Sequence, residues 1–469
     1  MPPAAAGDEH VVMVGAGIVN LMTAWRLTSA GYRIDVYDSG AGLLPTPDWV
    51  GYGCTLAGGN ARMFTLTEAD AYNSDALARS AGHPSVLDIA VSEGGWQAFA
   101  EEAWTAEERQ WAQEFQGVPS ALSDRYESDI LYLNQEAERC WDSCISHQPD
   151  LFKASGLSHG ILRIYDSSSS LEYGIERHRR IGALQRTFSV PELSAAYPAL
   201  SAPCQAGELA GGILVTGFTL GIHDFVFNLA ALLERNGVKF HWRHKIDRIE
   251  RMGTSGTIVG LRDHSDELIK AAHYVLSPGA YGRELLYGTE AGRQIQGVAG
   301  VWLTIPNVDP PLTESVKLRR DKHITPDTNI TIMKDPLRGP ALIIGAGYGW
   351  TGSSPENIDA AELTALFHGI EDTARVFFPG AYRVASADGW LQAARRWCVR
   401  PWTASSLGIF EVLPTVSGGS LIVTGGHNTG GFAQAPAVGE AVLAALRGAA
   451  HPMHVCYDPQ RLRHDLGRP

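Results

Sequence analysis

The chain has 469 residues, of which 45% are hydrophobic and 19% are charged, and this favours a globular protein with two domains. The net charge of −13 argues against broad nucleic-acid binding, which relies on a basic surface. The first residues lack the features of a secretory signal, and no apolar run is long enough to span a bilayer. Six cysteines without the spacing of a disulfide framework indicate reduced thiols, so we expect a cytoplasmic protein.

The chain begins with a pattern that predicts a strand at 10–14, a glycine turn that opens a helix, and a short strand at 34–37. This order, closed by an acidic residue, suits the pyrophosphate and ribose of a dinucleotide. Gly15 permits a sharp turn, and Gly17 lets the backbone approach a phosphate at the start of a helix. The residues expected to contact the nucleotide are Gly15, Gly17, Ile18, Val19, Asn20 and Asp38. Asn20 replaces the third glycine of the pattern, and the alternative interpretation is a structural glycine turn.

The rest of the chain mixes both kinds of secondary structure. The segment at 92–139 is acidic, rich in tryptophan and typical of helices, and apolar alternation at 297–350 predicts antiparallel strands. Further strands are expected at 160–165, 238–242 and 258–261, with an amphipathic helix at 223–237. The segment 273–280 predicts a buried strand that runs into a glycine turn. The block at 420–446 predicts a strand, a glycine-rich loop and a helix from Ala437 onward.

Four segments resemble the D-amino-acid oxidase superfamily of FAD-dependent oxidoreductases, which includes glycine oxidase, sarcosine oxidase and D-amino-acid dehydrogenase. They occur in the order that this family uses: 10–38, 58–62, 275–281, and the C-terminal pair 398–403 and 425–432. The resemblance implies an α/β fold with a Rossmann-like FAD-binding domain and an inserted antiparallel-sheet substrate domain. We expect the FAD-binding domain at 1–85, 206–290 and 390–469, and the substrate-binding domain at 86–205 and 291–389.

The resemblance implies further contacts with the flavin. The residues concerned are Gly59, Asn60, Ala61, Arg62, Gly279, Cys398, Gly430, Gly431 and Phe432. A physical argument also supports Gly430, Gly431 and Phe432, because backbone N–H groups at a helix start stabilise the negative charge of a reduced flavin. A plain turn between strand and helix is the alternative for this loop.

Arg400 is the residue that we expect to bind substrate. A guanidinium group can grip a carboxylate through two parallel hydrogen bonds, and the Arg-Pro pair at this place resembles such a clamp in the family. The family usually has an aspartate a few residues later, where this chain has Ser405 and Ser406. The alternative is a structural arginine that bonds nearby carbonyl groups.

Three other side chains are candidates with alternatives. Arg62 resembles an arginine near the flavin in sarcosine oxidase-like members, but it fits a structural role as well. Cys398 lies where monomeric sarcosine oxidases bond the flavin covalently, and a buried free thiol is the alternative. His427 is expected near the ring, where it tunes protonation of an amine, or else it is a loop histidine with ordinary partners.

These expectations predict FAD-dependent oxidation of a C–N bond in a small amino acid or N-substituted amino acid. Hydride passes to flavin N5, and the resulting imine can hydrolyse in water. The expected partner is therefore a small-molecule amine or amino acid. A flavin-dependent monooxygenase and an NAD-dependent dehydrogenase are the alternative enzymes, and a nucleotide-binding scaffold without activity is the third alternative. The sequence predicts no metal site.

Overall fold

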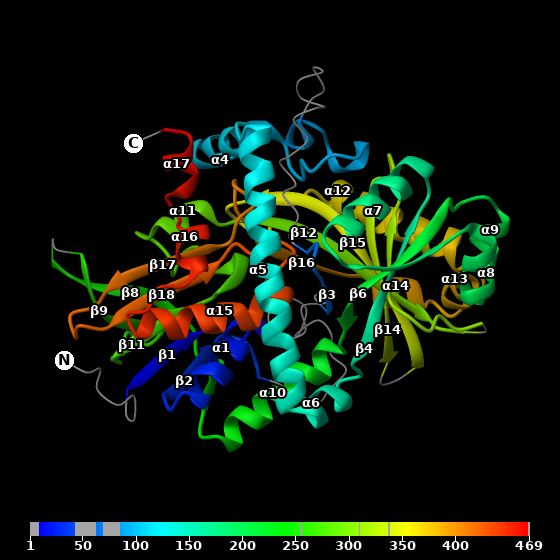
Figure 1. Cartoon of the computed structure of the whole chain (residues 1–469). Helices are drawn as coiled ribbons and strands as arrows, with labels where there is room; N and C mark the ends of the chain where they lie inside the picture. The colour runs from blue at the N-terminus through cyan, green and yellow to red at the C-terminus, as the bar shows by residue number, and fades with distance from the viewer. Residues whose placement is uncertain are drawn as a thin grey trace.

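The computed structural model describes residues 9–42, 62–68, 85–253, 256–308, 310–335 and 338–467. Two large sheets form the two halves of the molecule, and the long helix α5 (Ser120–His147) runs between these halves in the view of Figure 1. Among the described residues, no helix has both the length and the apolar composition needed to cross a membrane.

The first sheet has six strands in the order β17-β18-β11-β1-β2-β7, and all are parallel except the edge strand β17. Their bounds are β1 (His10–Val14), β2 (Arg33–Asp38), β7 (Lys239–Trp242), β11 (His273–Leu276), β17 (Ile409–Pro414) and β18 (Ser420–Gly425). The central strand β1 is buried on both faces, which explains its uninterrupted apolar sequence.

Different layers cover the two faces of this sheet. Helices α1 (Ile18–Ser29), α10 (Ile222–Arg235) and α15 (Gly431–Leu446) share one hydrophobic core with one face. A three-stranded antiparallel sheet packs on the other face. Its strands are β8 (Ile246–Met252), β9 (Thr257–Asp263) and β10 (Leu268–Ile269).

The second large sheet has nine strands in the order β16-β12-β15-β14-β13-β4-β6-β3, with β5 paired to β6. Its pairs are antiparallel except β13–β4. The strands are β3 (Met63–Thr65), β4 (Ser158–Tyr165), β5 (Leu184–Phe188), β6 (Gly211–Thr219), β12 (Gln296–Pro306), β13 (Val316–Arg319), β14 (Asp327–Asp335), β15 (Gly339–Gly352) and β16 (Arg396–Trp402).

The remaining helices surround these sheets, and α12, α13 and α14 pack on β12. Their bounds are α4 (Ala106–Gln116), α6 (Pro149–Ala154), α7 (Ser168–Arg180), α8 (Val190–Ala196), α9 (Ser201–Gln205), α11 (Glu290–Gln294), α12 (Ala360–Phe377), α13 (Pro379–Ala387), α14 (Trp390–Ala394), α16 (Pro452–Cys456) and α17 (Arg461–Asp465). Short 3₁₀ turns lie at Val86–Asp88, Val91–Glu93, Glu101–Ala103, Pro198–Leu200 and Gly279–Tyr281.

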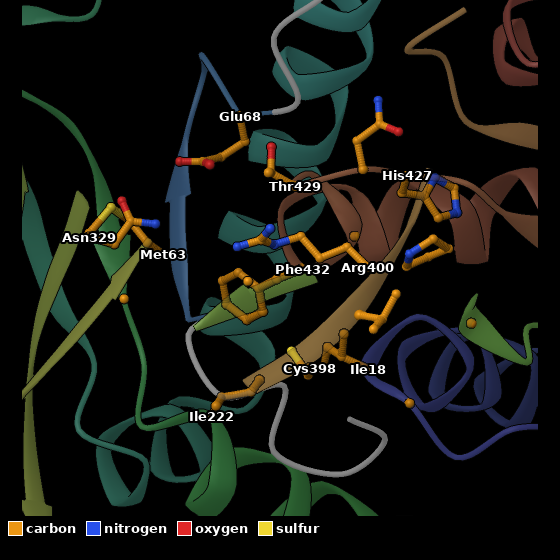
Figure 2. A pocket seen from close by; sticks show the side chains of 18 of the residues that line it. Ile18, Met63, Glu68, Ile222, Asn329, Cys398, Arg400, His427, Thr429 and Phe432 are labelled. Atoms are coloured by element: carbon orange, nitrogen blue, oxygen red, sulfur yellow. The ribbon is translucent and has the colours of Figure 1, made fainter. Parts of the chain in front are cut away.

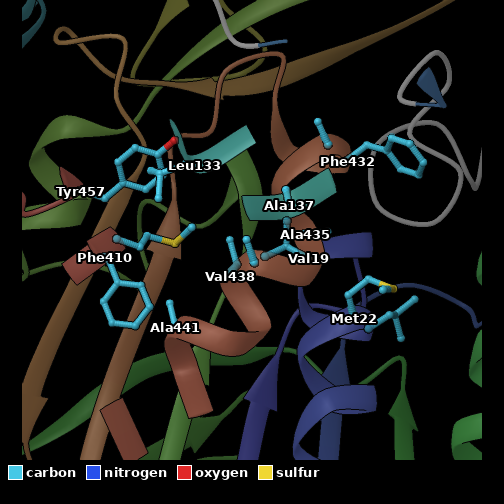
Figure 3. Packing of buried hydrophobic residues seen from close by; sticks show 14 of the residues in the cluster. Val19, Met22, Leu133, Ala137, Phe410, Phe432, Ala435, Val438, Ala441 and Tyr457 are labelled. Atoms are coloured by element: carbon cyan, nitrogen blue, oxygen red, sulfur yellow. The ribbon is translucent and has the colours of Figure 1, made fainter. Parts of the chain in front are cut away.

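Helix α5 fixes the position at which α15 begins. Leu133 and Ala137 of α5 belong to the same apolar cluster as Ala435 and Val438 of α15 (Figure 3). Deeper along α5, the Trp141 indole donates a hydrogen bond of 2.9 Å to a backbone carbonyl in the first turn of α15. The start of α15 is therefore held by packing on both sides, from α1 and from α5.

The predicted fold class, α/β with a Rossmann-like part and an antiparallel sheet, is confirmed. The prediction that the last long helix starts at Ala437 is wrong, because α15 begins at Gly431 and continues through Pro436. Packing of the buried α15 outweighs the one backbone hydrogen bond that a proline removes.

The predicted domain boundaries stay a prediction, and the two sheets do not follow them at every strand. Three strands of the nine-stranded sheet, β3, β6 and β16, come from ranges assigned to the FAD-binding domain. Strand β16, which falls in the range expected for the FAD-binding domain, therefore lies at the edge of the nine-stranded sheet.

Candidate active site

Two connected cavities lie at the carboxyl ends of the parallel strands. The sheet-edge cavity, about 190 Å³ in volume, is lined by the turns that follow β1, β2 and β11. The central cavity, about 240 Å³, lies between the starts of α1 and α15 and the strands β15 and β16 (Figure 2). The residues that line both cavities are Gly17, Ser277, Gly279, Val399 and Pro401. The two cavities are therefore parts of one elongated cleft.

Gly15 makes the turn after β1 that only glycine can make here. Its φ of +95° lies in the left-handed region, and a Cβ atom at this position would lie 2.5 Å from the carbonyl oxygen of Ser277. The Gly15 N–H donates to the Tyr37 carbonyl at 2.9 Å. The ends of β1, β2 and β11 can approach one another because this residue has no side chain.

Asp38 and Asn20 hold the same turn from two sides. The Asp38 carboxylate accepts hydrogen bonds from the backbone N–H groups of Ala16 at 2.7 Å and Gly40 at 2.6 Å. The Asn20 amide donates to the carbonyls of Val14 and Gly15, both at 2.8 Å. Asp38 lines the sheet-edge cavity, whereas Asn20 is buried behind the turn. In place of a third glycine, the asparagine supplies two hydrogen bonds that close the turn.

Two helix N-termini open onto the central cavity. Neither α1 nor α15 has a side-chain cap, and neither has an acidic residue in its first turn. Their first N–H groups and the positive ends of their dipoles favour negative charge in the cavity. The predicted residues that line it here are Gly17, Ile18, Val19, Gly431 and Phe432. Gly430 is the N-cap residue of α15, next to this lining.

Arg400 lies on β16 and enters the central cavity (Figure 2). Its guanidinium donates to the carbonyl of Gly347 at 3.0 Å, and its Cζ atom lies 5.3 Å from the centre of the Tyr348 ring. A Cβ atom on Gly300 of the neighbouring strand would come within 2.2 Å of this guanidinium. Among the described residues, Arg400 forms no ion pair with a carboxylate. The arginine is thus held in place by backbone and ring contacts and remains able to bind an anion.

Cys398 precedes Arg400 by two residues on β16 and therefore lies on the same face of the strand. Its partly buried thiol lines the central cavity with Ile18 and Ile222. Gly279, which follows β11, lines both cavities. Of the predicted flavin-loop residues, Gly59, Asn60 and Ala61 lie outside the described part of the chain.

His427 and Arg62 are both buried, but only His427 is part of the cavity lining. Complete burial lowers the pKa of His427 to about 4, so its imidazole is neutral at physiological pH. Burial also lowers the pKa of Arg62 to about 10, against the opposing effect of Asp224. The Arg62 guanidinium is therefore buried and interacts electrostatically with Asp224 of α10.

Several lining residues were not among the predicted site residues. They are Met63, Glu68, Asp327, Asn329, Tyr348 and Thr429. Tyr348 lies in the run Gly345–Trp350 of β15, where glycines alternate with larger residues and leave room along one face of the strand. That alternation was the available signal for Tyr348, and Thr429 lies inside the C-terminal segment 425–432 that the resemblance already included. Met63, Asp327 and Asn329 depend on how distant strands pair.

Comparison with known proteins agrees with this geometry. The family model described as FAD dependent oxidoreductase, DAO, matches residues 10–445. The chain is 24% identical to the D-amino acid dehydrogenase of Paramagnetospirillum magneticum over 447 residues, which cover 93% of this chain and 95% of the relative. Its fold is similar to that of glycine oxidase from Geobacillus kaustophilus, with a TM-score of 0.60 at 15% identity over 95% of this chain and 96% of the other.

Iminodiacetate oxidase from Chelativorans sp. BNC1 has a similar fold, also with a TM-score of 0.60 at 15% identity, over 96% of this chain and 98% of the other. The match to the family model extends from β1 almost to the end of α15, so it includes both halves of the cleft. The chain therefore belongs to the DAO family of FAD-dependent oxidoreductases, and it is an enzyme of that class.

Proposed function

We propose that this enzyme oxidises the C–N bond of an amino acid or N-substituted amino acid that carries a free carboxylate. The observation that carries this proposal is Arg400, a cavity-lining guanidinium that has no carboxylate partner among the described residues. The relative is named for a D-amino acid, and the two structural neighbours are named for glycine and iminodiacetate, all of which are amino acids.

The cleft fits FAD on its own geometry. A two-part ligand needs two connected cavities, and the glycine turn at Gly15 leaves no room for a side chain where a pyrophosphate would approach. Gly15, Gly17, Asp38 and Gly279 would hold the ADP part, while the start of α15 would face the flavin ring. When bound, FAD supplies the acceptor for the hydride that leaves the carbon next to nitrogen.

The protein's own groups then have simple roles. Arg400 binds the substrate carboxylate through two parallel hydrogen bonds and so orients the neighbouring carbon toward the cofactor. The low pKa of His427 keeps its imidazole neutral, so this residue adds no positive charge beside the substrate amine. The first N–H groups of α15 stabilise negative charge that develops at this end of the cleft. The imine product can hydrolyse in water.

A covalent link between Cys398 and FAD is a separate part of the proposal, supported by the position of the thiol in the cavity lining. Acid precipitation of the pure holoenzyme tests it, because only a bonded flavin pellets with the protein. Cys398→Ser should release the yellow colour into the supernatant, and Cys204→Ser, which alters a buried cysteine outside the cavity, should not. Free flavin from the unaltered protein would overturn the link.

The family assignment does not favour the flavin monooxygenase or the NAD-dependent dehydrogenase that the sequence left as alternatives. The proposed reaction is tested by adding amino acids and simple amines to the purified enzyme without oxygen and recording the flavin absorption bands. We expect bleaching by substrates with a free carboxylate and a much weaker response to their decarboxylated amines. A protein without flavin bands, or with bands that only the decarboxylated amines bleach, would overturn the proposal.

A further inference from the structure

A third cavity adjoins the central cavity. This polar chamber, about 520 Å³ in volume, lies over β4, β13 and β14 and below α7. It shares with the central cavity the lining residues Glu68, Asp327, Asn329, Tyr348 and Thr429. Figure 2 shows Arg400 pointing toward the side of the central cavity where Glu68, Asn329 and Thr429 lie. A substrate whose carboxylate is bound by Arg400 can therefore extend into this chamber.

The charges of the described residues that line the chamber do not cancel. Among these residues there are four cationic side chains and three carboxylates. Three of the cations have a carboxylate partner, in the pairs Lys317–Glu68 at 2.5 Å, Arg319–Asp327 at 2.8 Å and Arg177–Glu127 at 2.5 Å. The fourth cation is Arg163 of β4, which forms no ion pair with any carboxylate in the described ranges.

Hydroxyl groups hold Arg163 in place. Its Nη2 atom donates to Thr67 at 2.5 Å and to Thr65 at 3.2 Å, and the guanidinium also interacts with the Tyr165 hydroxyl. Its Nε atom is buried and has no hydrogen-bond partner among the residues that the structure describes. Hydroxyl groups orient a guanidinium without neutralising it, and a partly buried cation without a counter-ion is unfavourable. An arginine held in this way is suited to bind an anion that arrives from outside.

We propose that the substrate is an amino acid with a second, remote carboxylate, and that Arg163 binds this group in the polar chamber. This inference rests on the proposed function, since Arg400 must hold the first carboxylate. The planar guanidinium matches a carboxylate in geometry, and the ion pairs around it prevent Glu68 and Asp327 from repelling the ligand. The central cavity then selects the amino-acid head, and the chamber selects the acidic tail.

The test compares matched substrates on the purified holoenzyme, each as both enantiomers. Glutamate and 2-aminoadipate are compared with their neutral amides, and kcat/KM is measured from flavin bleaching. We expect the acids to exceed the amides by about tenfold or more, because one buried charged contact is lost with the amide. Arg163→Met should reduce this ratio to about one, mainly through a loss of kcat/KM for the acids.

Two variants serve as controls. Arg163→Lys keeps the charge and should keep part of the preference for acids. Arg179→Met removes an exposed arginine of α7 that pairs with Glu176 and does not line the chamber, so it should not change the ratio. If Arg163→Met does not fold, the inference is still tested by the ratio of kcat/KM for the acids to kcat/KM for the amides in the unaltered enzyme and in Arg163→Lys. Equal rates for acids and amides in the unaltered enzyme would overturn the inference, and so would a preference for a phosphonate analogue.

A binding measurement separates this inference from the proposed reaction. Glutarate, which has two carboxylates and no amine, should raise the Tm of the holoenzyme. The increase in Tm should be much smaller for Arg163→Met. If no amino acid bleaches the flavin but glutarate binds in this way, the proposed reaction is wrong and the chamber remains an acid-binding site. If neutral amino acids bleach the flavin as well as acidic ones do, the reaction stands and the role of Arg163 is wrong.

Discussion

The two ends of the cleft offer their binding groups in different ways. At the sheet-edge cavity, residues 14–40 of one strand–helix–strand unit form the turn, and Asp38 is already bonded to two backbone N–H groups. At the central cavity, Arg400 comes from β16, its neighbours come from β12 and β15, and its guanidinium lacks a carboxylate partner in the described chain. The sheet-edge end is built around one local unit, to which the turns near residues 244–247 and 277–282 add further lining, and it is suited to a constant cofactor. The central end is assembled from distant strands and is suited to a substrate. Changes at one end should therefore spare the other.

The largest effect is expected for Arg400→Met. Loss of the guanidinium removes a charged, two-point contact with the substrate, so kcat/KM for the best amino acid should fall about a thousandfold. The FAD content of the purified protein should stay unchanged, because the glycine turn is untouched. Flavin absorbance and steady-state kinetics measure both quantities on one sample.

Arg396→Met is the matched control, since Arg396 lies on the same strand but donates to carbonyls of residues 393 and 395 outside the cavity lining. It should keep nearly full activity. Loss of bound FAD in Arg400→Met would mean that the two ends of the cleft are not independent.

Gly15→Ala should affect the opposite end. The new Cβ atom would meet the Ser277 carbonyl at 2.5 Å in a left-handed backbone conformation, so the turn must open. A cost of about 2 kcal/mol lowers FAD affinity about thirtyfold. Titration of the apoprotein with FAD measures the change.

Gly237→Ala is the control for backbone strain alone, because Gly237 has a φ of +91° and nothing within 4 Å of its Cβ position. It should lower stability slightly and leave FAD affinity as it is. Equal losses of FAD affinity in the two variants would show that general strain, and not the approach to Ser277, matters at Gly15.

The same contrast explains which features the sequence could predict. The turn at Gly15 and the acid at Asp38 follow from neighbours within one short unit, so local pattern was sufficient. The local pattern did not predict the start of α15, because packing against α5 extends the helix through Pro436 back to Gly431. Local pattern is informative only where the contacts themselves are local.

Gly300 shows why the central cavity was harder to predict. This glycine matters because the Arg400 guanidinium occupies the space of its missing side chain, and that contact joins strands 100 residues apart. The neighbours of Arg163 likewise come from segment 62–68, β13 and β6, which meet only in the folded sheet. The resemblance to the family predicts Arg400, but only the three-dimensional structure shows that this arginine forms no ion pair with a described carboxylate.

His427 provides a pH test of the central cavity. Its imidazole takes up a proton near pH 6.5 in the unfolded chain but only near pH 4 in the buried site, so the unfolded state binds more protons between these values. Stability therefore rises with pH through this window, and lowering the pH from 7 to 5 should cost about 2 kcal/mol of unfolding free energy. His427→Gln should remove this part of the pH dependence in urea unfolding, whereas replacing the exposed His159 with Gln should not. An unchanged pH dependence in His427→Gln would mean that the imidazole is accessible to protons.

The smallest effect is expected for Asn20→Gly, which restores the third glycine of the dinucleotide pattern. If the asparagine were merely tolerated, the substitution would be neutral or would strengthen FAD binding. The structure gives Asn20 two hydrogen bonds to the turn, so their loss should cost about 1 kcal/mol and weaken FAD binding about fivefold. Asn20→Asp tests the same contacts without changing size, because a carboxylate cannot donate to the carbonyls of Val14 and Gly15 and would add negative charge at the start of α1. FAD titration of both variants should show weaker binding for each, and tighter binding by Asn20→Gly would mean that the sheet-edge end depends on glycine at this position.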